Sequence, residues 1–294
     1  MSFFDSMISR ERVLDSYEGW KTYRDKLTTY IINQFGTDYA GTKPVISLWG
    51  IGQSADMDLG RLTDYFRLVL IDRDLDAVRR GADHYGLSAS DYIALDIPFW
   101  NISDDDYRLF EAMLLDEVET DHIVEYFEKL AFKNSHLTCW HEKELFDISV
   151  AVGLHSQLNS RFAALLFHFK DSYSKEELSL ITAAISSLNE AGVTRLNDIM
   201  YATTKESLMY GYELAATGSY RESERIMKAL EEGKREELEG LKYIEGITQL
   251  MKDISIHNGC DIEVIDNRYD VWPFITGQGE KNYVMGFTTL KKIM

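Results

Sequence analysis

Short apolar runs, each closed by glycine, aspartate or proline, recur along this sequence. The run at 45–49 is followed at once by Gly50 and Gly52; it is too short for a helix and is typical of a buried strand in a parallel sheet. Similar runs predict further strands at 68–71, 91–97, 147–154, 193–201, 260–265 and 283–290. Helical patterns separate most of them. This alternation predicts an α/β, Rossmann-like, seven-stranded and mostly parallel sheet whose last strand is antiparallel.

Two capping motifs place helices between these strands. Ser103 with Asp106, and Ser174 with Glu177, have the spacing of a capping box. The first predicts a helical region through about residue 132, with a break near 119–121. The second predicts a helix that ends near Gly192, because a glycine commonly follows the last turn of a helix.

The remaining segments suggest additions to the sheet. Spacings of three, four and seven predict amphipathic helices before the first strand, on the residues Val13, Tyr17, Trp20, Leu27 and Ile31. Residues 203–235 are polar and have helical propensity. We therefore expect an N-terminal helical cap at 1–40 and one α/β domain at 41–294, with a helical insertion at about 203–235.

Charge and cysteine content narrow the classes of partner. The 294 residues include 49 acids and 31 bases, for a net charge of −18, which disfavours docking on nucleic acid. Cys139 and Cys260 lie far apart, without the spacing of metal ligands, so we expect no metal site. The sequence has neither a signal-peptide pattern nor a bilayer-spanning run, and we expect a cytoplasmic protein without a membrane partner. The sequence leaves open whether the protein forms a homo-oligomer.

The most specific stretch is the glycine turn after the first strand. Gly50 and Gly52 let the backbone turn tightly and approach a ligand, and Asp72 ends the next strand about twenty residues later. A strand, a glycine turn, a helix, a strand and an acid form the βαβ arrangement that holds a nucleoside, with the acid on the ribose hydroxyls. The alternative is an empty α/β turn in which Asp72 only caps the following helix.

Two further acids bear on which ligand this turn holds. Gly50, Gly52 and Ala55 also fit the dinucleotide pattern G-x-G-x-x-A. A dinucleotide places its pyrophosphate at the N-terminus of the next helix, which we expect to begin at residue 54 or 55 and to carry Asp56 and Asp58 in its first turn. Repulsion at short range costs on the order of a few kcal/mol. The turn therefore favours a nucleoside without phosphate, and a cationic one further.

The order of these parts resembles the class I S-adenosylmethionine-dependent methyltransferase family over roughly residues 40–200 and 238–294. The motifs that carry the resemblance are LWGIGQSAD, VLIDRD, Asp96 after the third strand, and a fourth strand that opens with Asp147 and leads into GLHSQL. The resemblance implies S-adenosylmethionine as cofactor and methyl transfer as activity. The N-terminal helices match the variable cap of many members.

The resemblance also assigns residues. Those implied to contact the cofactor are Gly50, Ile51, Gly52, Asp72, Arg73, Asp96, Ile97, Gly153 and Leu154. The glycines of the first turn would approach the methionine portion, Asp72 the ribose, and Arg73, Asp96 and Ile97 the adenine. Gly153 and Leu154 would lie beneath the sulfonium. The sequence departs from the family in Trp49, where a small or acidic residue is usual, and in Gln53-Ser54, which replace the third glycine.

Candidate groups for chemistry follow the fourth strand. His155 leaves that strand at the edge where α/β sheets bind ligands, so it is a candidate catalytic base or acceptor-orienting residue, with Gln157 a weaker candidate. Tyr17 and Trp20 of the cap are candidate substrate residues. We expect a small-molecule or peptide acceptor. Two alternatives stay open: a binding protein that has kept the fold and lost turnover, and an NAD-dependent oxidoreductase, which Asp56 and Asp58 disfavour.

Overall fold

The computed structural model describes residues 2–10, 16–36, 41–135, 144–234, 262–275 and 279–293, with the backbone alone at 8–10. The chain divides into two compact units. The helical unit comprises residues 1–13, 98–140 and 155–199, and the sheet unit comprises residues 14–97, 141–154 and 200–294. Val13, Cys139 and Cys260 lie outside the described residues. The apolar spacing at 238–254 also indicates a helix and Gly277 a turn, and both lie outside the described residues as well.

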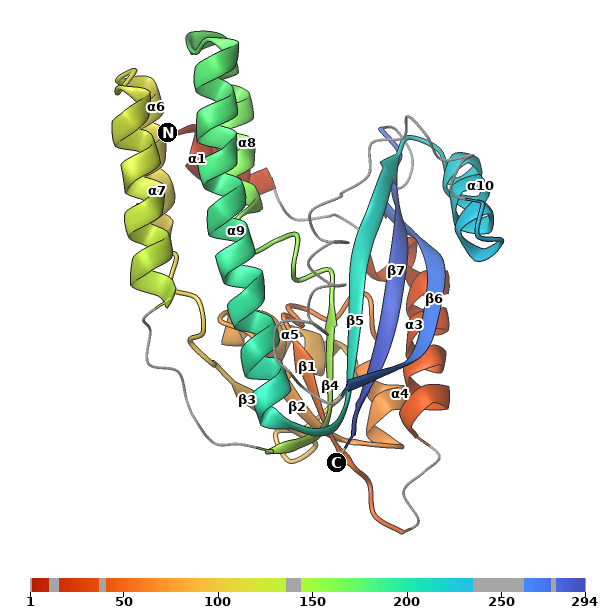
Figure 1. Cartoon of the computed structure of the whole chain (residues 1–294). Coiled ribbons are helices and arrows are strands. Elements are labelled where there is room, and N and C mark those ends of the chain that lie inside the picture. Colours follow the sequence, from red (N-terminus) through yellow and green to blue (C-terminus); the bar gives the residue numbers. More distant parts are fainter. Residues whose placement is uncertain are drawn as a thin grey trace. The chain divides into compact units, whose positions relative to one another are not determined.

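A seven-stranded sheet lies at the centre of the sheet unit (Figure 1). Its strands are β1 (Val45–Trp49), β2 (Arg67–Ile71), β3 (Tyr92–Leu95), β4 (Phe146–Val152), β5 (Thr204–Thr217), β6 (Ile262–Ile275) and β7 (Lys281–Lys292). Their order is β3-β2-β1-β4-β5-β7-β6. Strand β7 is antiparallel to both of its neighbours, and the other six strands share one direction. The predicted Rossmann-like sheet with an antiparallel last strand is confirmed.

The strands at the centre of the sheet are apolar because both of their faces are covered. In β1, Ile46 and Leu48 are fully buried, as are Leu70 in β2 and Val150 in β4. These side chains join one core with residues of α3 (Lys21–Phe35), among them Ile31. Continuous apolar runs of this kind are what strands buried on both faces require.

The fifth strand is not where the sequence pattern placed it. Residues 193–201 belong to the helix α9 (Lys175–Thr203), and β5 begins only at Thr204. The segment 203–235, expected to be a helical insertion, therefore contains a strand of the central sheet followed by α10 (Tyr220–Glu231). The prediction of a helical insertion was wrong.

Gly192 explains why α9 does not end early. A β-carbon at this position would lie 3.1 Å from the Trp100 ring and 3.4 Å from Leu158. The glycine therefore serves close packing within the helix instead of ending it, at a cost of roughly 1 kcal/mol relative to alanine. Beyond it, Val193, Leu196 and Ile199 continue the buried side of the same helix.

The N-terminal helices are divided between the two units. The helix α1 (Phe3–Arg10) belongs to the helical unit, whereas α2 (Ser16–Gly19) and α3 belong to the sheet unit. Gly36 follows the last residue of α3, and its amide donates to the carbonyl of Ile32. The sheet unit also contains α4 (Leu59–Thr63) and α5 (Leu75–His84), which connect β1 to β2 and β2 to β3.

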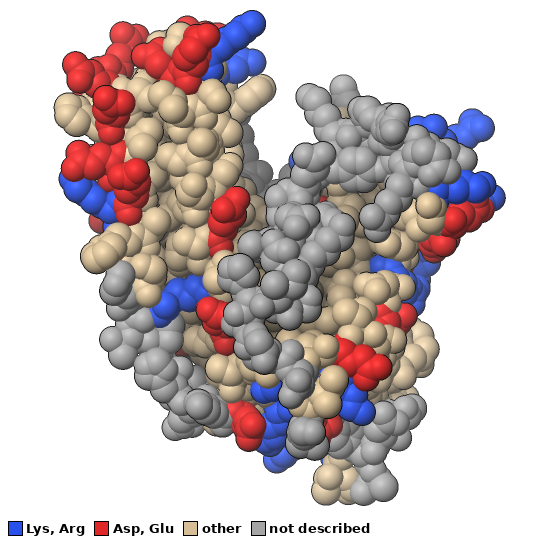
Figure 2. All heavy atoms as spheres, viewed as in Figure 1, with Lys and Arg blue, Asp and Glu red and all other residues tan. Residues whose placement is uncertain are grey.

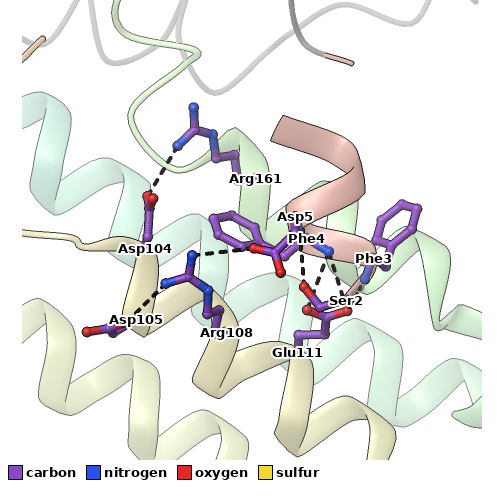
Figure 3. Close-up of polar contacts among 9 residues, drawn as sticks. All are labelled: Ser2, Phe3, Phe4, Asp5, Asp104, Asp105, Arg108, Glu111 and Arg161. Atoms are coloured by element: carbon purple, nitrogen blue, oxygen red, sulfur yellow. Dashed lines mark hydrogen bonds and ion pairs between the residues drawn. The ribbon is translucent and has the colours of Figure 1, made fainter. Parts of the chain in front are cut away.

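The helical unit packs α1 against longer helices. These are α6 (Asp104–Leu115), α7 (Thr120–Ser135), α8 (Ser160–His168) and α9, with a short 3-10 helix at Lys170–Ser172. Both capping boxes and the predicted break between α6 and α7 are confirmed. The buried Glu111 carboxylate of α6 accepts the amides of Phe3 (2.6 Å) and Phe4 (3.4 Å), and Arg108 bridges Asp5 and Asp105 (Figure 3). Glu111 thereby satisfies amides of the first turn of α1.

The acidic excess is visible on the surface. Exposed acids crowd the connection between α6 and α7, where Asp116, Glu117, Glu119 and Asp121 follow one another. Figure 2 shows acidic side chains gathered at this end of the two helices. Within the described ranges, no helix combines the length and the apolar composition needed to cross a bilayer.

Candidate functional site

The glycine turn lies directly after β1. Gly50 and Gly52 both have positive φ, of 67° and 50°, which β-carbon-bearing residues rarely adopt. A β-carbon on Gly50 would lie 2.6 Å from the side chain of Leu154, whereas one on Gly52 would meet nothing within 4 Å. Gly52 therefore presents bare backbone to open space. Ile51 between them is buried.

Asp72 lies immediately after β2 and reaches the same turn. Its Oδ2 accepts the Gly52 amide at 2.8 Å, and its Oδ1 accepts the Asp74 amide at 2.9 Å. Burial raises the pKa of Asp72, and these two amide hydrogen bonds oppose that shift. The first glycine turn and the acid after the second strand thus meet, as the sequence predicted. The role of Asp72 on a ribose stays a prediction.

Ser54 occupies the place of the missing third glycine. Its φ is 54°, so a serine here keeps the left-handed conformation that a glycine would supply. Its hydroxyl donates to the Met57 carbonyl at 2.8 Å, and its amide donates to the Ile51 carbonyl at 2.8 Å. The departure from the family pattern therefore changes the residue type and leaves the turn in a glycine-like conformation.

Three side chains hold successive carbonyls of this loop. Tyr17 donates through its hydroxyl to the carbonyl of Gln53, and Tyr85 to that of Ser54 at 2.9 Å. Arg24 donates to the carbonyl of Ala55 at 3.0 Å. Tyr17, a predicted substrate residue, thus lies against the glycine turn and stacks on His84 with a centroid distance of 3.7 Å. The loop conformation is set by side chains of α2, α3 and the end of α5.

The two acids after the turn lie differently from the prediction. The helix α4 begins at Leu59, not at 54 or 55, and Asp58 is its N-cap, accepting the Arg61 amide at 3.0 Å. Asp56 precedes the helix and is partly buried. Burial raises the pKa of Asp56 to about 6, although Arg24 and a hydrogen bond with the residue's own backbone oppose this. Asp58 therefore caps the helix, whereas Asp56 is a partly buried carboxylate between the turn and the helix.

Residues expected at the adenine follow β2 and β3. Arg73 and Asp96 are exposed, and Ile97 is buried with 6% of its surface accessible. Because β2 and β3 are parallel neighbours, Asp72 and Asp96 leave the same edge of the sheet. The amide of Asp72 donates to the carbonyl of Leu95 at 3.1 Å, which ties the two strand ends together.

The glycine after β4 lies under an aromatic ring and a carboxylate. Gly153 has a φ of 64°, and a β-carbon there would lie 3.3 Å from Trp272 and 3.6 Å from Oε1 of Glu213. The residue that follows, Leu154, packs against Gly50, as described above. Thus the two glycine turns predicted to bind the cofactor are neighbours: β1 and β4 are adjacent strands, and Leu154, which follows Gly153, packs against Gly50.

Trp272 is the centre of an aromatic cluster. Tyr23 stacks on it with a centroid distance of 5.5 Å, and Trp20 meets it edge-on at 4.8 Å. Phe274 and Tyr283 complete the cluster. Trp20, a predicted substrate residue, also donates to the Phe274 carbonyl at 3.1 Å. Trp20 therefore contacts residues of the C-terminal strands, whereas Tyr17 does so with the glycine turn and the end of α5.

His155 and Gln157 belong to the helical unit and are described within it. His155 is completely buried, and its Nε2 lies 2.9 Å from Oδ1 of Asn197 on α9. Burial lowers the pKa of His155 to about 4, so the imidazole is neutral at pH 7. Gln157 is exposed. The catalytic role expected for His155 stays a prediction, and its environment is that of a neutral structural histidine.

Trp49, the other departure from the family pattern, is a buried residue of β1. Its Nε1 donates to Ser47 Oγ at 2.9 Å, and that hydroxyl bonds Ser149 at 2.7 Å. Ser149 in turn bonds Thr204 at 2.6 Å. Trp49 thus belongs to a buried polar row, a chain of hydrogen-bonded side chains that crosses β1, β4 and β5. This gives the tryptophan a structural role outside the glycine turn.

Sequence reasoning missed Glu213, Trp272 and Arg24 as parts of this region. Glu213 was missed because its strand was interpreted as part of an insertion. The run at 208–216, apolar and with two tyrosines, was a signal for that strand. Trp272 and Arg24 approach the turn only through packing between segments far apart in the sequence. Among the described residues, no cluster of three His, Cys, Asp or Glu side chains could hold a metal ion.

Comparisons with known proteins add likenesses of fold at low identity. No protein-family model and no curated protein matches this sequence. The chain is similar to magnesium protoporphyrin IX methyltransferase (ChlM) from Synechocystis PCC 6803, with 9% identity, a TM-score of 0.40, and 99% of this chain and 94% of that chain covered. It is similar to the N-methyltransferase NodS from Bradyrhizobium japonicum WM9, with 7% identity, a TM-score of 0.42, and coverage of 99% and 97%.

A third similar structure is a putative RNA methyltransferase, PH1948, from Pyrococcus horikoshii. Its identity is 8% and its TM-score 0.42, with 99% of this chain and 97% of that chain covered. At such values the likenesses leave the acceptor and the activity undetermined. The fold itself rests on the strand order and on the directions of the strands.

Proposed function

We propose that this protein binds S-adenosylmethionine and transfers its methyl group to a small-molecule or peptide acceptor. One observation carries the proposal: the carboxylate after β2 reaches the glycine turn after β1, with 2.8 Å between Asp72 and the Gly52 amide. In a sheet of this strand order, that edge is where α/β folds bind ligands.

The residues of this edge fit such a cofactor. Gly52 leaves open space where a side chain would stand, so a ligand can lie against its backbone. Asp72 supplies carboxylate oxygens suited to ribose hydroxyls, and Asp96 follows the neighbouring parallel strand at the same edge of the sheet. Asp56 adds a partly buried carboxylate, which favours a cation over an anion.

The same geometry speaks against a dinucleotide. A pyrophosphate needs free amides at the N-terminus of the helix after the glycine turn. Here Asp58 already accepts the Arg61 amide at that terminus, and the helix starts only at Leu59. The oxidoreductase alternative therefore lacks its phosphate site.

Methyl transfer mainly requires that the acceptor atom be aligned with the methyl group. When bound, S-adenosylmethionine supplies an electrophilic methyl group on a sulfonium sulfur. The chain then has to hold the acceptor in line with that group and keep water away. Leu154 packs against Gly50, Gly153 lies against Trp272, and the aromatic cluster around Trp272 supplies apolar surface beside them. Cofactor-binding without turnover is the remaining alternative, and Trp49 does not support it, because its indole lies in the buried polar row.

Calorimetric titration with S-adenosylmethionine, S-adenosylhomocysteine and NAD tests the proposal. We expect saturable binding of both adenosyl ligands and none of NAD. Asp72→Ala should weaken binding at least tenfold, and Asp72→Asn, which keeps an acceptor for the Gly52 amide, checks that the effect is not one of folding. Asp76→Ala, an exposed acid of α5, is the matched control. Absence of binding by both adenosyl ligands, or unchanged affinity in Asp72→Ala, would overturn the proposal.

A further inference from the structure

The loop after the glycine turn combines an open approach with a fixed backbone. A β-carbon on Gly52 would meet nothing within 4 Å, so a ligand can lie against the turn there. The next three main-chain carbonyls, at positions 53–55, each accept a hydrogen bond from a side chain outside the loop. A peptide group is planar, so a bond to its carbonyl fixes the orientation of the whole group. Three successive peptide groups of the loop are therefore oriented by other elements of the sheet unit.

Arg24 of α3 joins the loop to the N-terminal helices. Only 9% of its surface is accessible. Its Nη1 donates to the Ala55 carbonyl at 3.0 Å and to the Tyr17 carbonyl at 2.7 Å. One guanidinium thus holds both the loop and α2. A guanidinium keeps its charge and its donors throughout the working pH range of proteins, so both contacts persist.

Two tyrosines hold the other two carbonyls, and one histidine packs against both of their rings. The Tyr17 hydroxyl donates to the Gln53 carbonyl, and the Tyr85 hydroxyl donates to the Ser54 carbonyl at 2.9 Å. The ring of His84 stacks on Tyr17 with 3.7 Å between centroids and meets Tyr85 edge-on at 5.0 Å. Burial raises the pKa of both phenols, so both hydroxyls stay protonated and act as donors at neutral pH.

The conformation that these contacts hold is a strained one. Ser54 has a φ of 54°, in the left-handed region that residues with a β-carbon rarely adopt. Strained backbone of this kind persists only where its surroundings determine it several times over. Ser54 meets that condition, because its amide and hydroxyl are hydrogen-bonded within the loop and its carbonyl is held by Tyr85. The loop therefore depends on contacts from outside for part of its conformation.

We propose that Tyr17, Arg24 and Tyr85 are positioning residues for the cofactor: they hold the loop in the conformation that the cofactor binds, and they set its affinity in this way. The inference rests on the proposed function. A loop that is ordered before binding spares the ligand the conformational entropy of ordering it, so binding is tighter than to a loose loop. Tyr17, a candidate substrate residue on sequence grounds, is thereby assigned to the cofactor loop.

Binding of S-adenosylhomocysteine, measured by calorimetric titration, tests the two tyrosines. Tyr17→Phe and Tyr85→Phe each remove one hydroxyl and keep the ring, and each should weaken binding at least threefold. Tyr126→Phe is the matched control, because the Tyr126 hydroxyl donates to the Asp106 carbonyl at 2.9 Å in the helical unit. This variant loses the same kind of hydrogen bond and should bind as the parent does.

Arg24 is tested by a pair of variants in the same titration. Arg24→Met removes both hydrogen bonds and keeps an apolar side chain of similar length, and it should weaken binding at least tenfold. Arg24→Lys keeps the positive charge and a donor, and it should recover part of that loss.

Hydrogen exchange separates a positioning role from a purely structural one. Coupling between two sites is reciprocal, so a ligand that favours the held loop must also steady the residues that hold it. Bound S-adenosylhomocysteine should therefore slow the exchange of the amides at 16–24 in the parent protein. Tyr17→Phe should reduce that slowing, and Tyr126→Phe should retain it.

The outcomes distinguish this inference from the proposed function. Failure of the parent protein to bind either adenosyl ligand would overturn both. Where the parent binds, an undiminished affinity in either tyrosine variant of the loop or in Arg24→Met would overturn the positioning role alone. An equal loss of affinity in Tyr126→Phe, or exchange at 16–24 that the ligand leaves unchanged, would overturn it as well.

Discussion

The carbonyl oxygen of Gln53 lies 2.5 Å from the point where a β-carbon on Gly81 would stand. Gly81 belongs to α5 and Gln53 to the turn after β1, so a helix glycine lets the loop pass directly over the helix. The carbonyl carbon of Gln53 would be only 2.7 Å from the same β-carbon. Both are backbone atoms, so the contact leaves little freedom to adjust.

Gly81→Ala is therefore expected to destabilise the protein despite the better helix propensity of alanine. The helix propensity of alanine adds about 1 kcal/mol to the free energy of unfolding, and the forced shift of the backbone removes about 1–3 kcal/mol. We therefore expect a net loss of stability. Gly60→Ala in α4 is the control, since its nearest contact is a side-chain oxygen at 3.3 Å. Urea unfolding of both variants measures the difference. Equal stability of the two would contradict the expectation.

Ser54 gives a second prediction. Because its φ is 54°, Ser54→Ala keeps the strain and loses the hydrogen bond to the Met57 carbonyl, whereas Ser54→Gly loses the bond and relieves the strain. The glycine variant should be more stable than the alanine variant by about 1 kcal/mol. Thermal or urea unfolding decides the order. A more stable alanine variant would show that the left-handed conformation is not held in solution.

His155 predicts how stability depends on pH. The folded-state pKa is about 4 against an ordinary value of 6.5, because burial disfavours the charged imidazole. The unfolded chain therefore binds the proton more tightly, and stability is fully present above pH 6.5 and is lost as the pH falls toward 4. The loss amounts to about 3 kcal/mol.

His155→Gln should flatten that part of the pH profile, even though it lowers stability at pH 7 by disturbing the contact with Asn197. His84→Gln replaces an exposed histidine and should keep the profile of the parent protein. Urea unfolding at several pH values from 4 to 7 measures both. A profile in His155→Gln as steep as that of the parent would refute the burial of a neutral imidazole.

Asp56 predicts how cofactor affinity depends on pH. With a pKa of about 6, its carboxylate is mostly protonated at pH 5 and mostly ionised at pH 7. If a cationic ligand lies beside it, affinity should rise about tenfold over that interval, because ionisation then favours binding. Arg24 is the cation that opposes the shift, and Tyr17, Tyr23 and Tyr85 lie within the influence of Asp56.

The variant Asp56→Asn isolates this effect from the titration of Asp72. It should bind S-adenosylmethionine more weakly at pH 7 and lose most of the pH dependence, whereas Asp64→Asn, an exposed acid, should behave like the parent. The Asp56→Asn protein should also be more stable than the parent at pH 8. In the parent, the raised pKa of Asp56 means that stability is lost as the pH rises from 3.8 to about 6, and asparagine removes this loss. Titration calorimetry at pH 5 and 7 measures the binding. An undiminished pH dependence in Asp56→Asn would exclude a cation beside it.

The strands predictable from sequence were those whose signal is local. Strands β1, β2 and β4 are short apolar runs with breakers at their ends, and Asp72 and the glycines lie within a few residues of those ends. Strand β5 was missed because Lys205 and Glu206 begin it and Glu213 interrupts its apolar pattern. The prediction that α9 ends at Gly192 was wrong, because this glycine allows close packing against Trp100, a residue far away in the sequence.

The candidate site divides in the same way. The turn and the acid that meets it are contained in one βαβ segment, so their spacing alone placed them together. The aromatic cluster around Trp272 brings Tyr23 of α3 together with residues of β6 and β7. Tyr23 and Trp272 lie more than two hundred residues apart in the sequence. Only the pairing of β5, β7 and β6 brings these residues to one edge, and no periodicity within the chain encodes that pairing.

The position of β7 has a consequence for synthesis on the ribosome. Of the seven strands described in this sheet, β7 is synthesised last, yet it lies between β5 and β6. Until residues 281–292 emerge, β5 and β6 each lack the neighbour that β7 provides among the described strands. Exposed strand edges invite association with other chains. A nascent chain of this protein should therefore need shielding until its final strand arrives, and loss of that strand would leave two aggregation-prone edges in place of one finished sheet.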